Sequence, residues 1–142
     1  LDYVKKYLKI QKIRMGQKLD FSIDVDARFL NLKMPFMILQ PIVSNSIDHG
    51  IYDVDNGIIR IYSVDLGSDV MLIIEDNGVG MKTEKIEEIL SGDYDASEKT
   101  LSNGIGLLNS DKRLIYQFGS AYRLKIESEV DKGTKISIKI PK

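Results

Sequence analysis

Two pairs of alternating runs, each joined by a short turn, constrain the fold of this 142-residue chain more than any other feature of its sequence. The runs GIIRIYSVD (57–65) and DVMLIIED (69–76) are separated by LGS, which is typical of a β-hairpin. The runs YRLKIESEV (122–130) and TKISIKIPK (134–142) flank DKG and predict a second hairpin. LDFSIDVD (19–26) alternates in the same way and predicts one more strand.

Helical spacing of apolar residues marks the segments between these strands. Four helices are expected, over residues 1–17, 34–51, 82–92 and 104–119. Pro35 suits a first helical turn whereas Pro41 would interrupt a helix, so we expect the second helix to begin near Pro35 or to restart at Pro41. Residues 93–103 are polar without a period and predict a loop. This order predicts an α/β (α+β) two-layer sandwich, in which helices cover one face of a mixed, mainly antiparallel sheet.

Composition excludes several functions. The formal net charge of -1 gives no reason to expect a nucleic acid partner. The absence of cysteine excludes a disulfide framework, thiol catalysis and cysteine-ligated zinc, and His49 is the only histidine. No apolar run approaches the roughly 20 residues of a membrane span. Because the chain begins at Leu1 without an initiator methionine, we expect it to be a piece of a longer protein that carries any membrane segments elsewhere.

The predicted strand 69–76 ends in a carboxylate that is followed closely by two glycines, Gly78 and Gly80. Glycine permits positive φ and lets the backbone approach a ligand. The carboxylate of Asp76 is an acceptor, which suits an exocyclic amine such as adenine N6. A tight turn after a strand explains the same residues. Both interpretations, a turn and the floor of a nucleotide pocket, stay open on these residues alone.

A second glycine pair, Gly104 and Gly106, opens the predicted helix 104–119. Free amides at a helix N-terminus bind phosphate, and a flexible hinge is the alternative interpretation. Neither glycine pair belongs to a common phosphate motif. The chain has no GxxxxGK[ST] sequence, and Asn109 stands where the third glycine of GxGxxG would fall.

Asn45 lies inside the apolar segment 34–51. Burying an amide costs free energy unless it has a partner. Its neutral oxygen would suit Mg²⁺, which prefers few protein ligands together with waters and phosphates. Alternatively, Asn45 caps a neighbouring backbone group.

Taken in order, these features resemble the ATP-binding domain of the GHKL superfamily, which includes sensor histidine kinases, DNA gyrase, Hsp90 and MutL. PIVSNSIDHG corresponds to the N box, DNGVG to the G1 box, residues 82–103 to the ATP lid and GIGLLN to the G2 box. DKGTKISIKIP matches the closing GxGT motif. The resemblance implies the Bergerat ATP-binding fold, with Asp76 selecting adenine, Asn45 holding Mg²⁺, and Gly104 to Leu107 contacting phosphates under lid closure. The ATP-binding residues that it implies are Asn45, Asp48, His49, Asp76, Gly78, Gly80, Met81, Gly104, Ile105, Gly106, Leu107 and Thr134.

YLKIQKIRMGQKL and LQPIVSN are similar to LytS/YesM-like sensor histidine kinases, which carry YLxIQxxR before the first strand and LQPLVENAxxHG at the N box. Gyrase and Hsp90 place a water-activating glutamate one helical turn before the N-box asparagine, where this chain has Pro41, which offers no base. The resemblance therefore implies a protein-histidine kinase domain that transfers the γ-phosphate of Mg-ATP to a histidine on a separate dimerisation domain. Residues 1–18 are expected to end that dimerisation region as a hinge helix, and residues 19–142 to form the catalytic domain.

The same resemblance implies partners and a cellular location for the longer protein. The isolated chain is expected to bind ATP with little turnover and to contain no phosphoacceptor, since His49 lies inside the N box. The longer protein is expected to be a homodimer and to pass phosphate to a response regulator. The longer protein is expected to be a bacterial membrane-bound receptor that holds this domain in the cytoplasm. The domain itself is expected to contact neither nucleic acid nor the membrane.

Three residues depart from the subfamily pattern. Ser44 replaces a glutamate, Asp48 stands where many kinases have a lysine near the phosphates, and Leu108 replaces an arginine. These departures leave two alternatives: a gyrase- or Hsp90-like ATPase that drives conformational change, and a degenerate nucleotide-binding or interaction domain. Five basic residues in the lid and the helix after it could reach phosphates, but charged residues in such segments are usually only solvated, so none is chosen as catalytic: Lys82, Lys85, Lys99, Lys112 and Arg113.

Overall fold

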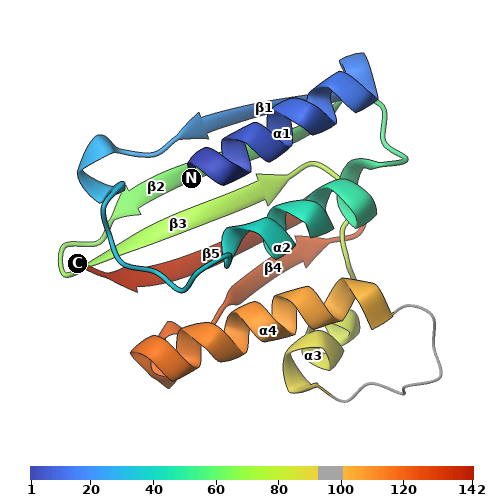
Figure 1. Cartoon of the computed structure of the whole chain (residues 1–142). Helices are drawn as coiled ribbons and strands as arrows, with labels where there is room; N and C mark the ends of the chain where they lie inside the picture. Colours follow the sequence, from blue (N-terminus) through green and yellow to red (C-terminus); the bar gives the residue numbers. More distant parts are fainter. Residues whose placement is uncertain (93–100) are drawn as a thin grey trace.

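The computed structural model describes residues 1–92 and 101–142. Its strands form one five-stranded sheet in the order β1-β2-β3-β5-β4, with the helices on one face (Figure 1). The strands are β1 (Leu19–Asp24), β2 (Gly57–Asp65), β3 (Asp69–Asp76), β4 (Lys125–Glu129) and β5 (Gly133–Pro141). The α-helices are α1 (Asp2–Met15), α2 (Leu39–Asn45), α3 (Thr83–Ser91) and α4 (Leu101–Phe118), and a π-helix, η3 (Ser46–Ile51), continues α2. The predicted two-layer sandwich is confirmed.

The sheet is mixed and mainly antiparallel, as the sequence predicts. β1 is parallel to β2, with Leu19 opposite Gly57, and every other neighbouring pair is antiparallel. The predicted bounds of β2 and β3 agree with the structure residue for residue. In the β3–β5 pairing Asp76 lies opposite Thr134, so the end of β3 lies beside the start of β5.

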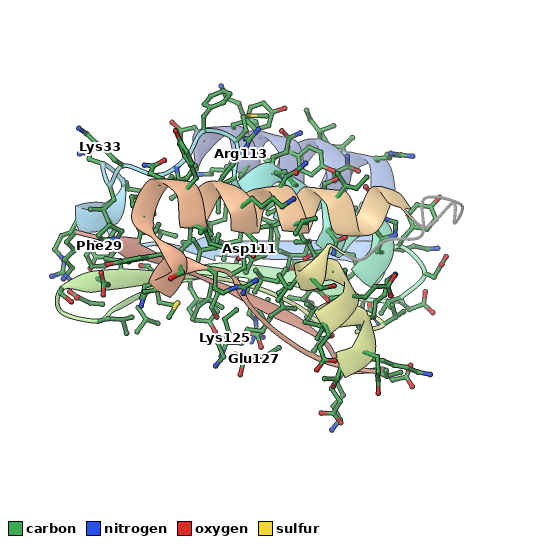
Figure 2. The ribbon with its side chains drawn as sticks, turned by 90° about the horizontal axis from the view of Figure 1, so that it is seen from below. Phe29, Lys33, Asp111, Arg113, Lys125 and Glu127 are labelled. Atoms are coloured by element: carbon green, nitrogen blue, oxygen red, sulfur yellow. The ribbon has the colours of Figure 1, made fainter. Side chains whose placement is uncertain are left out.

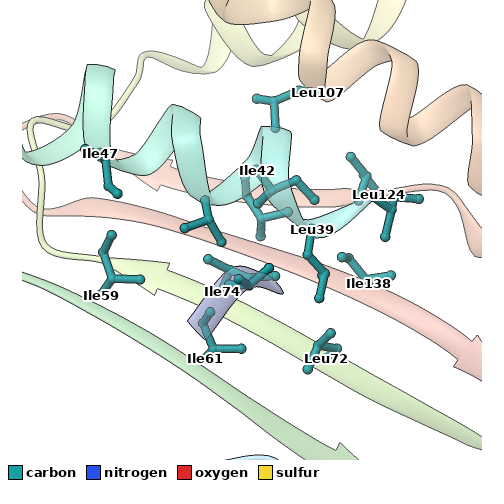
Figure 3. Close-up of a cluster of buried hydrophobic side chains, with 14 of the residues drawn as sticks. Leu39, Ile42, Ile47, Ile59, Ile61, Leu72, Ile74, Leu107, Leu124 and Ile138 are labelled. Carbon is teal, nitrogen blue, oxygen red and sulfur yellow. The ribbon is translucent and has the colours of Figure 1, made fainter. Parts of the chain in front are cut away.

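The core lies between the sheet and the helices. Figure 3 shows Leu39 and Ile42 of α2 above Ile61 and Ile74 of the sheet, with Leu107 of α4 nearby. Full burial of one such side chain stabilises the fold by about 1.5–3 kcal/mol. None of the helices in the described part of the chain is both long enough and apolar enough to cross a membrane.

Helix α1 packs on the same core through Val4 and Leu8. It ends at Gly16, whose φ of 62° suits glycine. The helix lies beside β1 and α2 on the helical face of the sheet (Figure 1). That residues 1–18 also end a dimerisation region stays a prediction.

Helix α2 begins at Leu39, so the expectation of a helix starting near Pro35 is wrong and the alternative start at Pro41 is closer. Pro41 occupies the first turn, where its missing N–H costs nothing. The apolar character of residues 34–38 comes instead from a non-helical segment in which Met37 has a φ of 57°.

Helix α4 begins at Leu101, three residues before the predicted start at Gly104. Gly104 and Gly106 therefore lie within the helix and do not open it. Close packing accounts for Gly106, since an ideal Cβ there would lie 3.1 Å from the Cβ of Pro41. The glycine lets α4 approach α2 where the two helices meet.

Candidate functional site

A cavity of about 230 Å³ opens where the end of β3 meets α2, η3 and α3. Its lining residues are Asn45, His49, Gly50, Asp76, Gly80, Met81, Lys85, Ile89 and Thr134. They come from the N box, the G1 box, the helix after it and the start of the last strand. The fold thus brings together the N box, the G1 box and the closing GxGT motif, which lie far apart in the sequence.

Asp76 is the buried carboxylate of this cavity, with 5% of its surface exposed. Burial raises its pKa above the ordinary aspartate value, while hydrogen bonds from the Ser46 hydroxyl and from the amides of Gly78 and Thr134 act in the opposite direction. The Gly78 amide donates to Oδ1 at 2.9 Å. A carboxyl group held by fixed donors at the wall of a cavity is a preorganised acceptor for a ligand N–H.

Gly50 and Gly78 lie close to each other beside the carboxylate of Asp76, where little room is left for a side chain. An ideal Cβ on Gly78 would lie 2.3 Å from the carbonyl oxygen of Gly50, so no side chain fits there. The Gly50 carbonyl accepts a hydrogen bond from the Val79 amide at 2.9 Å, which fastens the G1 loop to η3. A Cβ on Gly50 would in turn lie 3.1 Å from Oδ1 of Asp76. These glycines thus allow close packing of the G1 loop against η3, and the predicted approach of Gly78 to a ligand stays a prediction.

The loop after Asp76 is held against the β4–β5 hairpin. Gly80 has a φ of 69°, and an ideal Cβ on it would lie 2.0 Å from the carbonyl oxygen of Glu129. The Met81 amide donates to Ser128 Oγ at 2.7 Å. Ser128 Oγ also lies 2.8 Å from Thr134 Oγ1. Sequence reasoning missed Ser128, although the hairpin register that places it opposite Thr134 would have found it.

The N box reaches the cavity through a change of helix type. The π-helix η3 follows Asn45 directly, and Asn45, His49 and Gly50 all line the cavity. π-Helical turns are rare and are frequent at functional sites. Ser46 is buried and donates to Asp76, so this helix supports the carboxylate as well as lining the space beside it.

Several predicted residues do not line the cavity. Asp48 is exposed, and its Oδ2 accepts a hydrogen bond from Ser44 Oγ at 3.0 Å. Tyr7 of α1 donates to that same Ser44 hydroxyl at 3.4 Å. The departures Ser44 and Asp48 thus belong to one hydrogen-bonded group that includes α1.

The G2 box is also absent from the lining of the cavity. Leu107 is fully buried in the core and Ile105 is partly exposed. Because α4 begins at Leu101, Gly104 to Leu107 form its second turn, and amides beyond the first turn of a helix bond to carbonyls four residues earlier. Of the predicted lid, residues 93–100 lie outside the described residues.

Asp111 ties α4 to the two residues just before β4 and was not found by sequence reasoning. The residue is 1% exposed, and its carboxylate accepts hydrogen bonds from Arg123 Nη2 at 2.9 Å and from the Leu124 amide at 2.7 Å. Figure 2 shows Asp111 and Arg113 on different sides of the helix. Arg113 donates to the Phe36 carbonyl at 3.0 Å, which ties α4 to the segment before α2.

The donor set restricts the metals that fit. Within residues 1–92 and 101–142, no group of three or more His, Cys, Asp or Glu side chains is placed to hold a metal ion. Asn45 lines the cavity, and its amide oxygen would suit Mg²⁺ that is bound mainly by water and ligand oxygens.

Comparison with known proteins agrees with this geometry. A family model described as "Histidine kinase-, DNA gyrase B-, and HSP90-like ATPase" matches residues 32–142. The sensor histidine kinase YesM of Bacillus subtilis (strain 168) is 35% identical over 141 residues, which cover 99% of this chain and 22% of the relative. The sensor protein LytS of Oceanobacillus iheyensis is 33% identical over 142 residues, which cover 99% of this chain and 24% of the relative. The chain thus spans less than a quarter of the length of these relatives.

Solved structures show the same fold. The catalytic domain of histidine kinase ThkA matches with a TM-score of 0.69 at 21% identity, covering 100% of this chain and 92% of that one. The histidine kinase domain of the blue-light activated kinase from Erythrobacter litoralis matches with a TM-score of 0.63 at 16% identity, covering 99% and 59%. The chain has the Bergerat fold and belongs to the family of histidine kinase-, DNA gyrase B- and HSP90-like ATPases.

Proposed function

We propose that this chain is the catalytic domain of a sensor histidine kinase, which binds Mg-ATP and passes the γ-phosphate to a histidine outside the chain. The observation that carries the proposal is the buried carboxylate of Asp76 in a cavity that Asn45 also lines. The family match and the sensor-kinase relatives support it.

In this proposal the adenine ring enters the cavity beside Asp76 and donates from its N6 amine to the carboxylate. Gly80, Met81 and Thr134 line the same cavity and would surround the base. Asn45 would supply the protein ligand to Mg²⁺, which neutralises phosphate charge when it is bound. Gly104 to Leu107 would contact phosphates only after a rearrangement of the first turns of α4, because the structure holds them inside the helix.

Phosphate transfer is favoured over hydrolysis by the residue one turn before Asn45. That position is Pro41, which packs against Gly106 and has no group that accepts a proton. A general base must lie within hydrogen-bond reach of the water that it activates. An imidazole nitrogen from outside would instead attack the γ-phosphorus, and the bond to the β–γ bridging oxygen would break, releasing ADP. The isolated chain would then bind ATP with little turnover.

The remaining parts of the proposal concern the longer protein. Its relatives are sensor proteins of about four times this length, so the chain would act beside its own dimerisation domain in a homodimer. A response regulator would receive the phosphate. A receptor in a bacterial membrane would hold this domain on the cytoplasmic side.

Calorimetric titration with Mg-ATP tests the proposal on the wild type and on Asp76→Asn. The wild type is expected to bind, and the variant to bind at least tenfold more weakly, because an amide in place of the carboxylate presents a donor to the adenine amine. Asp69→Asn is the matched control, since Asp69 lies at the other end of β3 and bonds to Tyr122. No binding by the folded wild type would overturn the proposal. Equal binding by wild type and Asp76→Asn would remove Asp76 from its role, and steady ATP hydrolysis would favour the ATPase alternative.

A further inference from the structure

The cavity has one positively charged wall. Among the described residues that line it, Lys85 is the only lysine or arginine. It lies one helical turn before Ile89 on α3, and both residues line the cavity. Because residues four apart share a face of a helix, this face of α3 is turned toward the cavity.

The other basic residues considered near the lid are placed elsewhere or are not described. Lys82 is exposed just before α3 and does not line the cavity. Lys112 and Arg113 line a separate open groove with Phe36 and Tyr116. Lys99 lies outside the described residues.

We propose that the ammonium group of Lys85 binds the phosphate chain of the nucleotide that occupies the cavity. The inference rests on the proposed function and adds to it the residue that balances the phosphate charge. A triphosphate brings several negative charges into a space that already contains the carboxyl group of Asp76. A lysine is a compact charge on a flexible stem, so it can follow a phosphate over several ångströms.

The partner that Lys85 has in the structure is easily exchanged. Its Nζ lies 3.4 Å from Glu88 Oε1 and 3.5 Å from Oε2. The two side chains are 35% and 40% exposed, and ion pairs with this exposure contribute little to stability. A charge-assisted bond to phosphate is stronger than such a pair. Binding would therefore transfer Lys85 from Glu88 to the nucleotide.

Affinities for Mg-ATP and for adenosine separate a phosphate contact from a general effect on the cavity. Competition against a fluorescent ATP analogue measures both ligands on the same protein. Lys85→Gln is expected to weaken ATP binding about tenfold and to change adenosine binding by less than about twofold. Lys85→Arg is expected to stay near the wild type for ATP. Lys82→Gln makes the same change of net charge outside the cavity and is expected to leave both affinities unchanged.

Glu88→Gln provides a second, independent measurement. It releases Lys85 from its pair and is expected to tighten ATP binding by about twofold, whereas Glu87→Gln on the exposed side of α3 is expected to have no effect. The inference is overturned if Lys85→Gln weakens ATP no more than Lys82→Gln does, or if adenosine affinity falls in parallel. In either case a wild type that binds ATP would leave the proposed function standing. A folded wild type that binds neither ligand would overturn both.

Discussion

The backbone of Gly78 lies against the backbone of Gly50, so that a Cβ on Gly78 would sit 2.3 Å from the Gly50 carbonyl oxygen. This contact joins the G1 loop to η3 directly beneath the carboxylate of Asp76, and the Val79 amide bonds to the same carbonyl. Main-chain contacts therefore join the G1 loop to η3 beside the cavity, in addition to the hydrogen bond from the Ser46 hydroxyl to Asp76.

Gly78→Ala is expected to lower the free energy of unfolding by about 2–3 kcal/mol, because backbone atoms must move to admit the methyl group. Urea unfolding followed by circular dichroism measures the change. Val79→Ala is the control in the same loop, since Val79 is 41% exposed, and it is expected to change stability by about 0.5 kcal/mol or less. A Gly78→Ala variant as stable as Val79→Ala would contradict the close contact.

Burial of Asp76 makes a prediction about pH. Because burial raises the folded pKa of Asp76 above the ordinary aspartate value, the folded state binds a proton more readily than the unfolded state. The contribution of Asp76 to stability is then largest below the ordinary aspartate pKa and is lost as pH rises through the raised folded pKa.

Comparing wild type with Asp76→Asn isolates this contribution from other carboxyl groups. The free energy of unfolding of the wild type, minus that of the variant, is expected to increase as pH falls from 7 toward 4. Equilibrium urea unfolding at a series of pH values measures it. A difference that decreases over the same range would show that the donors around Asp76 outweigh its burial.

The pair formed by Asp111 and Arg123 joins α4 to the segment just before β4. Arg123→Ala leaves the buried carboxylate of Asp111 without its cation and is expected to cost about 2 kcal/mol, less than the roughly 3–5 kcal/mol of a fully buried pair because the guanidinium is half exposed. Thermal unfolding provides the measurement. Lys125→Ala removes an exposed pair with Glu127 within β4 and is expected to cost about 0.5 kcal/mol or less. Equal costs for the two variants would show that burial of Asp111 has no energetic consequence.

Local patterns predicted most of the fold. β2 and β3 were predicted to the residue because each run has a clear β pattern bounded by turn residues. Helix starts were predicted less well, since Pro41 and Gly106 are placed by the contact between α2 and α4 and not by local preference. Pro41 and Gly106 lie far apart in the sequence, so a local pattern does not reveal their contact.

The residues of the candidate site also divide into those that a local motif predicts and those that depend on contacts between distant segments. Asn45, Asp76 and Thr134 were identified from short motifs, and the structure places all three around one cavity. Their roles toward a nucleotide stay predictions. Ser128 and Lys85 carry no motif, because their place depends on strand register and on which face of α3 turns inward.

The change from α-helix to π-helix at Ser46 alters which residues of the N box face the core. In a continuous α-helix with the buried positions Leu39, Ile42 and Val43, residue 50 would follow their stripe into the core. Because a π-helical turn contains more residues than an α-helical turn, the position that faces the core is residue 51 instead of residue 50. Ile51 is therefore buried, and Gly50 lies beside Asp76. Deleting one residue between 46 and 51 would restore the α-helical phase and rotate Gly50 away from the carboxylate. The length of this segment is therefore as much a determinant of the site as the residues within it.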